Sequence, residues 1–292
     1  MTKHKTVLVA GATGYLGRFI VAELHRRGHR VRAVVRDRDR AVSPGPWEAP
    51  GLEGLVDEWI VGDVTDPGVT PGIAAGADAV ISALGVTRQR ADPWDIDYRA
   101  NLAILRSAES HGARCFCFVN VIGGEQCPAR LTRAKTAFAR ELASSSIPSQ
   151  TINPPGYFSD MIQILRMARR GRVLVLRRGV RINPIHGADL ATFCADRLVS
   201  GREGTWDVGG PELFTWQGLA ECAFHALGRP ATVTTVPSAA LTPLTRVVGL
   251  VSPRRADALR FAAWSMLHDC VGEPIGTHGL LEFYKRHAAD MD

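Results

Sequence analysis

The stretch that most constrains the fold is residues 6–17, which read TVLVAGATGYLG. An apolar run of the kind found in buried parallel strands, residues 7–10, breaks at Gly11, and glycines recur at Gly14 and Gly17. Apolar residues at helical spacing follow as far as Arg27, namely Leu16, Ile20, Val21 and Leu24. A strand, a tight glycine turn and a helix in this order predict the first βαβ unit of a parallel sheet.

Each glycine of this turn has its own physical role. Gly11 permits the turn, Gly14 lets the backbone approach a pyrophosphate, and Gly17 lets the helix pack closely on the strand. The free N–H groups and the positive dipole end of the helix then face the anion. An ordinary glycine-rich turn is the alternative interpretation. We predict a dinucleotide site formed by Gly11, Thr13, Gly14, Tyr15, Leu16 and Gly17.

Strands and helices alternate along the first half of the chain. Further apolar strands are predicted over residues 30–35, 59–61, 77–82, 115–121 and 150–153. This alternation predicts an α/β fold with a doubly wound parallel sheet, a Rossmann fold. We expect residues 1–155 to form the dinucleotide-binding domain and residues 156–292 a smaller substrate-binding region with strands that return to the sheet. Within it, the apolar segment at about residues 237–269 is interpreted as one or two helices that form a lid, or alternatively a dimer face.

Ligands of such a sheet bind at the carboxyl ends of its strands. Arg36 and Arg38 follow the second strand, where arginine favours the 2′-phosphate of NADPH, whereas Asp37 leaves NADH open. Asp63 after the third strand is predicted to accept a hydrogen bond from adenine or to cap the next helix. The other predicted cofactor contacts at strand ends are Val64, Ala83, Leu84, Gly85, Pro154, Gly156, Tyr157 and Phe158.

Composition and charge exclude several classes of protein. The formal net charge is +6, but the basic clusters at residues 36–40, 166–172 and 254–255 are short and dispersed, so we expect no nucleic-acid partner. No apolar run approaches the roughly 20 residues that span a bilayer, and the chain enters a strand almost at once, which leaves no room for a signal peptide. We expect a cytoplasmic monomer or homodimer without a membrane partner.

The cysteines and lysines carry further information. The six cysteines form no CxxC pair and no zinc spacing, so no metal site is expected. Of the 35 basic residues only four are lysines, a bias that together with the abundance of alanine and glycine is typical of a GC-rich genome. Against this bias Lys135, deep in the chain, stands out.

Three segments together resemble a known superfamily: GATGYLG at residues 11–17, GYFSDM at 156–161 and INPIHGADL at 182–190. Over roughly residues 6–220 the chain resembles the atypical short-chain dehydrogenase/reductases, in the branch of NmrA-like and isoflavone-reductase-like proteins. The resemblance implies a Rossmann core, bound NAD(P)(H) and a small C-terminal substrate region.

The catalytic groups of that superfamily are only partly present. They are a serine at the end of the fifth strand and a Tyr-x-x-x-Lys motif in the next helix, where the lysine orients the ribose and lowers the pKa of the tyrosine. Lys135 matches the lysine, but the tyrosine position holds Leu131, and residues 119–125 contain no serine or threonine. The candidates for catalysis are Lys135, Asn120 and His186, whose alternatives are a solvated lysine, an asparagine that satisfies backbone groups and a structural histidine.

The missing tyrosine directs the functional prediction. Loss of a general acid lowers a rate by about 10²–10⁴, which is tolerable if the substrate supplies its own proton or stabilises its own alkoxide, as a ketone beside a phenolic hydroxyl does. We therefore expect an NAD(P)H-dependent oxidoreductase, specifically an NADPH-dependent ketoreductase of a hydroxylated aromatic, polyketide-like ketone or quinone. The chain resembles the tyrosine-less ketoreductases of angucyclinone-type antibiotic biosynthesis. The alternatives are a non-catalytic, NADP(H)-sensing NmrA-like regulator and, third, an isomerase.

Overall fold

The structure, a computed structural model, describes residues 4–86 and 91–289, with only the backbone for residues 240–242 and 244. The chain divides into two compact units. The first comprises residues 1–120, 134–153 and 187–206, and the second comprises residues 121–133, 154–186 and 207–292. The predicted boundary at residue 155 therefore falls close to one of several crossings of the chain between the units.

The first unit is built on parallel strands. They are β1 (Thr6–Ala10), β2 (Arg30–Val35), β3 (Glu58–Val61), β4 (Ala79–Ser82), β5 (Phe116–Val119) and β6 (Ser149–Asn153). With β9 (Gly204–Gly209) and β12 (Glu273–Pro274), the sheet has eight strands in the order β12-β9-β6-β5-β4-β1-β2-β3. From β1 the sheet continues through β2 and β3 on one side and through β4, β5 and β6 on the other. The switch point, where such sheets bind ligands, therefore lies between β1 and β4. The predicted α/β fold with a doubly wound parallel sheet is confirmed.

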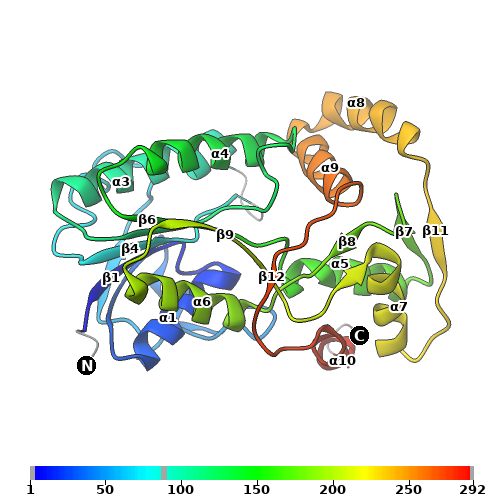
Figure 1. Cartoon of the computed structure of the whole chain (residues 1–292), viewed down its shortest axis with the longest axis horizontal. Coiled ribbons are helices and arrows are strands. Elements are labelled where there is room, and N and C mark those ends of the chain that lie inside the picture. The colour runs from blue at the N-terminus through cyan, green and yellow to red at the C-terminus, as the bar shows by residue number, and fades with distance from the viewer. Residues whose placement is uncertain (1–3, 87–90, 290–292) are drawn as a thin grey trace. The chain divides into compact units, whose positions relative to one another are not determined.

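Helices cover both faces of this sheet. In Figure 1, α1 (Tyr15–Arg26) and α6 (Gly187–Ser200) lie on one face, and α3 (Asn101–Ser110) and α4 (Arg130–Ala143) lie on the other. Gly187 permits the close approach of α6 to α1, because a Cβ atom there would lie 2.4 Å from the ring of Phe19. The core between the layers is apolar, with Val7, Leu8 and Val9 fully buried.

Two local features of this unit were not predicted from the sequence. Residues 36–40, for which a solvated charged loop is the alternative to a 2′-phosphate site, lead into the short helix α2 (Arg38–Val42), because the Asp37 carboxylate accepts a hydrogen bond from Arg40 N and caps the helix. The helical segment at residues 94–110 begins with a π-helical turn, η1 (Trp94–Ala100), before α3.

The second unit mixes short strands with helices. Its strands are β7 (Val173–Val175), β8 (Arg181–Ile182), β10 (Phe214–Thr215) and β11 (Val233–Thr235), where β7 pairs with β11 and β8 with β10. Its core lies between α5 (Phe158–Arg169), α7 (Trp216–Ala226) and α10 (Leu280–Ala289), and the hydroxyl of buried Tyr284 donates to Met161 O at 3.0 Å.

The apolar segment predicted at residues 237–269 contains two α-helices. They are α8 (Leu241–Val251) and α9 (Pro253–Ser265), preceded by a short 3₁₀ turn, η2 (Ser238–Ala240). Ser252 between them caps α9 by accepting from Arg255 N. Among the described residues, no helix combines the length and apolarity needed to span a bilayer.

Candidate functional site

The glycine turn between β1 and α1 has no room for side chains. Gly11 has a φ of +80°, and a Cβ atom there would lie 2.7 Å from the Ala83 backbone. A Cβ atom on Gly17 would lie 2.1 Å from Gly11 O, and one on Gly14 would lie 3.2 Å from the same oxygen. The turn therefore brings the end of β1 directly against the chain after β4, as the predicted site requires.

The N-terminus of α1 carries no side-chain cap. Gly14 occupies the N-cap position, and the first turn contains no acidic residue. Its positive dipole end is thus not compensated by this helix's own side chains, which is the arrangement that binds a phosphate. The hydroxyl of Tyr15 accepts from Gly187 N at 3.1 Å and Leu16 is buried, so both side chains hold α1 in place.

Arg18 organises the neighbourhood of this turn, and sequence reasoning missed it. Its buried guanidinium donates to Thr13 O at 3.2 Å and to four carbonyls around α2, those of Arg40, Ala41, Ser43 and Pro50. Burial and the charge of Arg40 lower the pKa of Arg18. Arg18 therefore ties the glycine turn to the segment after β2. The signal for its role lies in contacts distant in sequence, so helical spacing alone does not reveal it.

The ends of β2 and β3 carry the predicted adenosine contacts. Arg38 is the first residue of α2, and its guanidinium lies 5.6 Å from the Trp59 ring centroid. Asp63, directly before Val64, accepts from Thr65 N at 2.9 Å and Thr65 Oγ1 at 2.7 Å. These bonds, together with the charge of Arg36, lower the pKa of Asp63. Asp63 therefore closes a turn of its own, and its contact with adenine stays a prediction.

Lys135 is a buried lysine rather than a solvated one, with 8% of its side chain exposed. Its Nζ donates to Leu84 O and to Val119 O, each at 3.0 Å, and lies 3.3 Å from Asp97 Oδ1. The two carbonyls use two of the three hydrogens that an ammonium donates, and the Asp97 carboxylate supplies the opposite charge. A Cβ atom on Gly85 would lie 4.0 Å from this Nζ. Lys135 of α4 is therefore held between the carboxyl ends of β4 and β5.

The partner of Lys135, Asp97, was not predicted from the sequence. Its side chain is fully buried in η1, and this burial raises the pKa of Asp97 in spite of the opposing effect of Lys135 and of the Val86 N–H. The amide of Asn101 donates to the carbonyls of Ile96 and Asp97, while Asn101 Oδ1 accepts from Ser82 Oγ at 2.5 Å. An available sequence signal was the pair of polar residues, Asp97 and Asn101, at helical spacing on an apolar face.

Asn120 lies at the end of β5 in the same unit. Its backbone N–H donates to Ile152 O at 2.8 Å, which continues the sheet. Its side-chain Oδ1 is buried and has no hydrogen-bond partner among the residues that the structure describes. A buried acceptor without a partner is rare in a folded protein, so Asn120 fits a site that a ligand completes.

The remaining predicted residues lie in the second unit. Pro154 O accepts from Ile122 N, and Gly156 O accepts from Ile185 N, so both hold the loop before α5. The backbone N–H of Tyr157 donates to the Asp160 carboxylate at the start of α5. Phe158, the next residue, is packed in the core of this unit: it is 1% exposed, and its ring centroid lies 5.3 Å from that of Phe283.

His186 is part of an aromatic cluster in that core. Its ring stacks on His278 at a centroid distance of 4.2 Å and lies 5.6 Å from Phe158. The rings of His186 and Phe158 are both buried. Both residues lie in the second unit, and the cofactor contact predicted for Phe158 and the catalytic or structural role predicted for His186 stay predictions.

The segment that carries the position of the missing tyrosine is covered by α9. The Asp257 carboxylate accepts from Arg130 N at 2.7 Å and from Leu131 N at 3.3 Å, at the start of α4. Trp264 packs on Gly123, where a Cβ atom would lie 2.6 Å from the indole. These contacts fix α9 against residues 123–131 within the second unit, and its role as a lid or a dimer face stays a prediction.

Together these features fit a dinucleotide. The glycine turn forms a cradle that a Cβ atom would fill, the end of α1 above it is uncapped, and Asn120 presents a buried acceptor without a partner. Among the described residues, no group of three or more histidine, cysteine or acidic side chains is placed to hold a metal ion.

Comparisons with known proteins agree with this geometry. A family model described as NAD(P)H-binding matches residues 11–198. The chain is 32% identical over 247 residues to a divinyl chlorophyllide a 8-vinyl-reductase of Zea mays, an alignment that covers 80% of this chain and 62% of that protein. The chain thus spans less than two thirds of that relative.

Two solved structures share the fold. The NADPH-dependent quinone oxidoreductase of Escherichia coli, complexed with NADPH, superposes with a TM-score of 0.73 at 17% identity over 96% of this chain and 99% of that one. The Citrobacter sp. triphenylmethane reductase complexed with NADP(H) gives a TM-score of 0.73 at 16% identity over 96% and 99% of the two chains. At these identities the likeness concerns the fold.

Proposed function

Because this chain belongs to the family of NAD(P)H-binding proteins, we propose that it is an NADPH-dependent reductase of a large, flat, conjugated aromatic ketone or quinone. The observation that carries the proposal is a buried Lys135–Asp97 pair at the strand ends, in a chain whose tyrosine position is Leu131. The hydroxylated, polyketide-like ketone expected from the sequence is one member of this substrate class.

The proposed binding roles follow from the chain's own groups. The glycine turn and the N-terminus of α1 bind the pyrophosphate, and Arg36 and Arg38 bind the 2′-phosphate. Lys135 binds the nicotinamide ribose, and Asp97 is a positioning residue that holds its Nζ at the ends of β4 and β5. When bound, the cofactor supplies the hydride.

The chain lacks a tyrosine to protonate the product, so the acceptor has to stabilise charge itself. A quinone delocalises the added electron pair over its ring, and a ketone beside a phenolic hydroxyl has an internal hydrogen bond. The amide nitrogen of Asn120 is proposed to donate to the carbonyl oxygen of the substrate, which leaves its unpartnered Oδ1 to accept from a hydroxyl of the bound ligand. The names of the compared reductases support this class, since they describe enzymes of a chlorophyllide, of quinones and of triphenylmethane dyes.

Loss of NADPH absorbance with a panel of acceptors tests the proposal. We expect turnover with quinones and with aryl ketones that carry an adjacent hydroxyl, and rates lower by about 10²–10⁴ for the same ketones without it. Tight NADPH binding with no turnover of any acceptor contradicts the proposal and favours an NADP(H)-sensing regulator.

A substitution at the tyrosine position sharpens this test. Leu131→Tyr is expected to raise the rate for ketones that lack the adjacent hydroxyl and to leave quinone reduction unchanged, because only the former need an external acid. Leu131→Phe is the matched control, since it adds the same ring without the hydroxyl. Equal effects of the two variants would show that the lack of a general acid does not limit the rate at which these ketones are reduced.

A further inference from the structure

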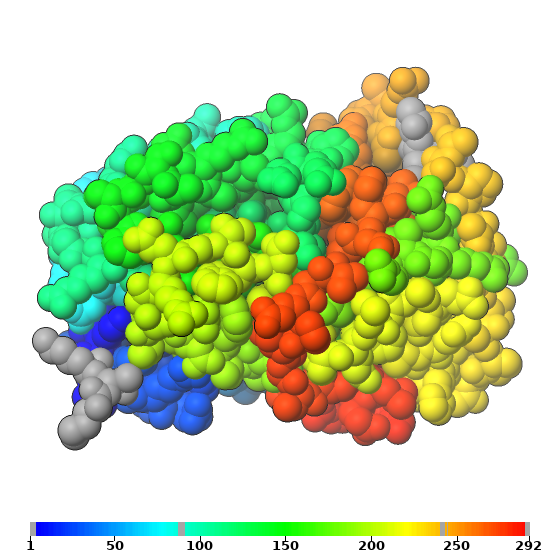
Figure 2. All heavy atoms as spheres, viewed as in Figure 1, coloured from blue at the N-terminus to red at the C-terminus, as the bar shows by residue number. Residues whose placement is uncertain are grey.

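The turn between α8 and α9 exposes large apolar side chains. Leu250 is 88% exposed, Val251 84% and Val247 62%, which makes them the three most exposed large apolar residues that the structure describes. Both views of the molecule show α8 at the edge of the second unit (Figures 1 and 2). Burial within this unit does not account for these side chains.

The same turn is ordered by local interactions. Ser252 N donates to Val248 O at 2.8 Å, and the Ser252 hydroxyl accepts from Arg255 N at 3.3 Å. Pro253 occupies the first turn of α9, where its fixed φ is favourable. The exposed apolar residues are therefore presented by two helix ends with a defined geometry.

The charge around these residues is strongly positive. Residues 241–265 contain four arginines, Arg246, Arg254, Arg255 and Arg260, and one acidic residue, Asp257. The Asp257 carboxylate is already engaged by the backbone of Arg130 and Leu131. In the part of the chain that the structure describes, none of these four arginines forms an ion pair.

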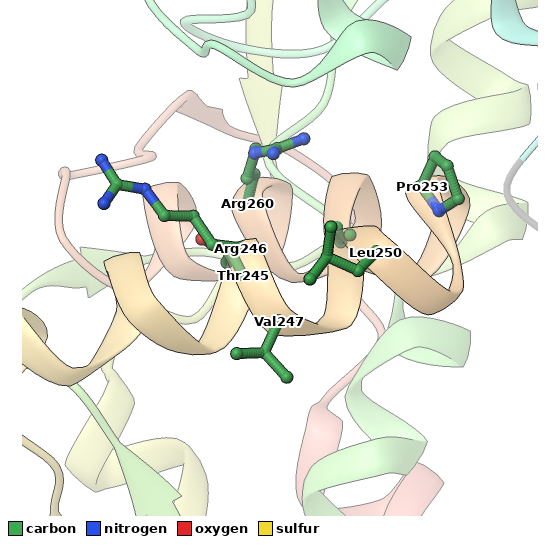
Figure 3. Close-up of a pocket in the computed structure, with 8 residues that line it drawn as sticks. Thr245, Arg246, Val247, Leu250, Pro253 and Arg260 are labelled. Atoms are coloured by element: carbon green, nitrogen blue, oxygen red, sulfur yellow. The ribbon is translucent and has the colours of Figure 1, made fainter.

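Two of the arginines border a shallow hollow. It has a volume of about 510 Å³ and is lined by residues of both helices, including Arg246 from α8 and Arg260 from α9. Figure 3 shows these two side chains on the same side of the helix pair, with Val247 directed the opposite way. The hollow leaves space for an anionic group beside the two guanidinium groups.

From this combination we propose that the α8–α9 tip, residues 246–255, docks on the surface of an anionic lipid bilayer. Leu250 and Val251 enter the boundary between headgroups and acyl chains, and the arginines bind lipid phosphates, as in interfacial amphipathic helices. This proposal departs from the sequence-based expectation of no membrane partner, which rested on the absence of an apolar run long enough to span a bilayer. Docking at a bilayer would give the reductase access to a lipophilic acceptor.

Charge argues against a second copy as the occupant. In a two-fold dimer the same patch is present on both partners, so an interface centred on this tip would bring its arginines close to their own copies. Like charges across an interface are unfavourable. An anionic bilayer surface supplies the charge that is complementary to the arginines, and it can contact the outward-facing side chains of both helices.

Co-sedimentation of the full chain with vesicles tests the proposal without any need for turnover. We expect binding to vesicles of phosphatidylcholine mixed with phosphatidylglycerol, little binding to phosphatidylcholine alone, and weaker binding as salt is added. Leu250→Asn with Val251→Asn is expected to weaken binding about tenfold or more. Arg254→Gln with Arg255→Gln is expected to weaken it roughly fivefold for each charge removed.

Matched controls lie elsewhere in the second unit. Leu213→Asn changes an apolar side chain that is 55% exposed, and Arg172→Gln removes an exposed arginine. Neither is expected to change vesicle binding. Absence of sedimentation with anionic vesicles overturns the proposal, as does equal weakening by the controls.

Two further results would replace the proposal with another occupant. A dimer in analytical ultracentrifugation that Leu250→Asn with Val251→Asn dissociates, without vesicle binding, assigns the tip to an interface between copies. A raised KM for a water-soluble quinone in the same variant, without vesicle binding, assigns it to the substrate lid. Because vesicle binding is measured without an acceptor, failure of the reductase proposal does not affect this test.

Discussion

Replacement of Lys135 by methionine gives the sharpest test of the site at the strand ends. The substitution keeps an unbranched side chain of similar length but removes the charge that faces Asp97. The Asp97 carboxylate is fully buried and then has no nearby cation among its described contacts, while Leu84 O and Val119 O lose their donor. We expect Lys135→Met to fold with a large loss of stability.

The geometry sets the size of this loss. For two charges 3.3 Å apart, an effective dielectric constant of about 20 gives an attraction of about 5 kcal/mol. Removal of one partner of a buried ion pair typically costs about 3–5 kcal/mol. In a domain of this size that corresponds to a fall in Tm of roughly 6–20 °C.

The loss should depend on pH in a defined direction. Burial raises the pKa of Asp97 in the folded protein, so the stability linked to this group is full below its unfolded pKa and is lost as pH rises through the folded one. Lys135 opposes that rise in the wild type, and its removal raises the folded pKa further. The deficit of Lys135→Met should thus be small in acid and grow toward neutral pH, as thermal melts at several pH values can measure.

A double-mutant cycle separates this explanation from a simple packing defect. Lys135→Met with Asp97→Asn removes both charges, and removal of a whole buried pair is often close to neutral. We therefore expect the double variant to recover most of the stability lost in Lys135→Met. The reasoning is refuted if the double variant is as unstable as the sum of the single variants and if the deficit of Lys135→Met does not change with pH.

Three further predictions concern the rest of the site. Gly17→Ala is expected to abolish the thermal stabilisation by NADPH, because its Cβ atom would lie 2.1 Å from a backbone oxygen, whereas Gly72→Ala, with nothing within 4 Å, should bind normally. Arg36→Gln with Arg38→Gln is expected to raise the Kd for NADPH by roughly ten- to a hundredfold while that for NADH stays unchanged, since charge-assisted bonds contribute about 1.5–3 kcal/mol; an equal change for both cofactors in calorimetry would remove these arginines from the 2′-phosphate site. Asp257→Ala is expected to cost about 0.5–2 kcal/mol, the range for a lost helix cap, and to speed proteolysis within α9, which unaltered cleavage would contradict.

Features fixed by local backbone constraints were predictable from the sequence. The turn from Gly11 to Gly17 follows from steric limits within a dozen residues, and β2 has the bounds expected from its apolar run. The parallel sheet followed from the alternation of strands and helices. These features needed no knowledge of which distant segments meet.

Features that depend on distant contacts were not predictable in the same way. The π-helical turn that carries Asp97 depends on Asn101, whose side chain is held by Ser82 of β4. Arg18 resembles a surface residue of α1 until the segment after β2 folds over it and supplies carbonyl acceptors. Hydrogen bonds between segments distant in sequence therefore determine the π-helical turn and the burial of Arg18, which local periodicity does not predict.

The Lys135–Asp97 pair also bears on whether the missing tyrosine marks a lost activity. A buried ion pair is a weak source of stability, because apolar residues of the same volume often stabilise a core as well or better. Stability alone thus gives a poor account of a lysine and an aspartate buried together at the carboxyl ends of β4 and β5. A carboxyl group with a raised pKa beside a charged partner is, by contrast, a common property of functional sites. The physical chemistry of this pair therefore favours a working cofactor site at the strand ends, with the acid of the usual mechanism replaced by the properties of the substrate.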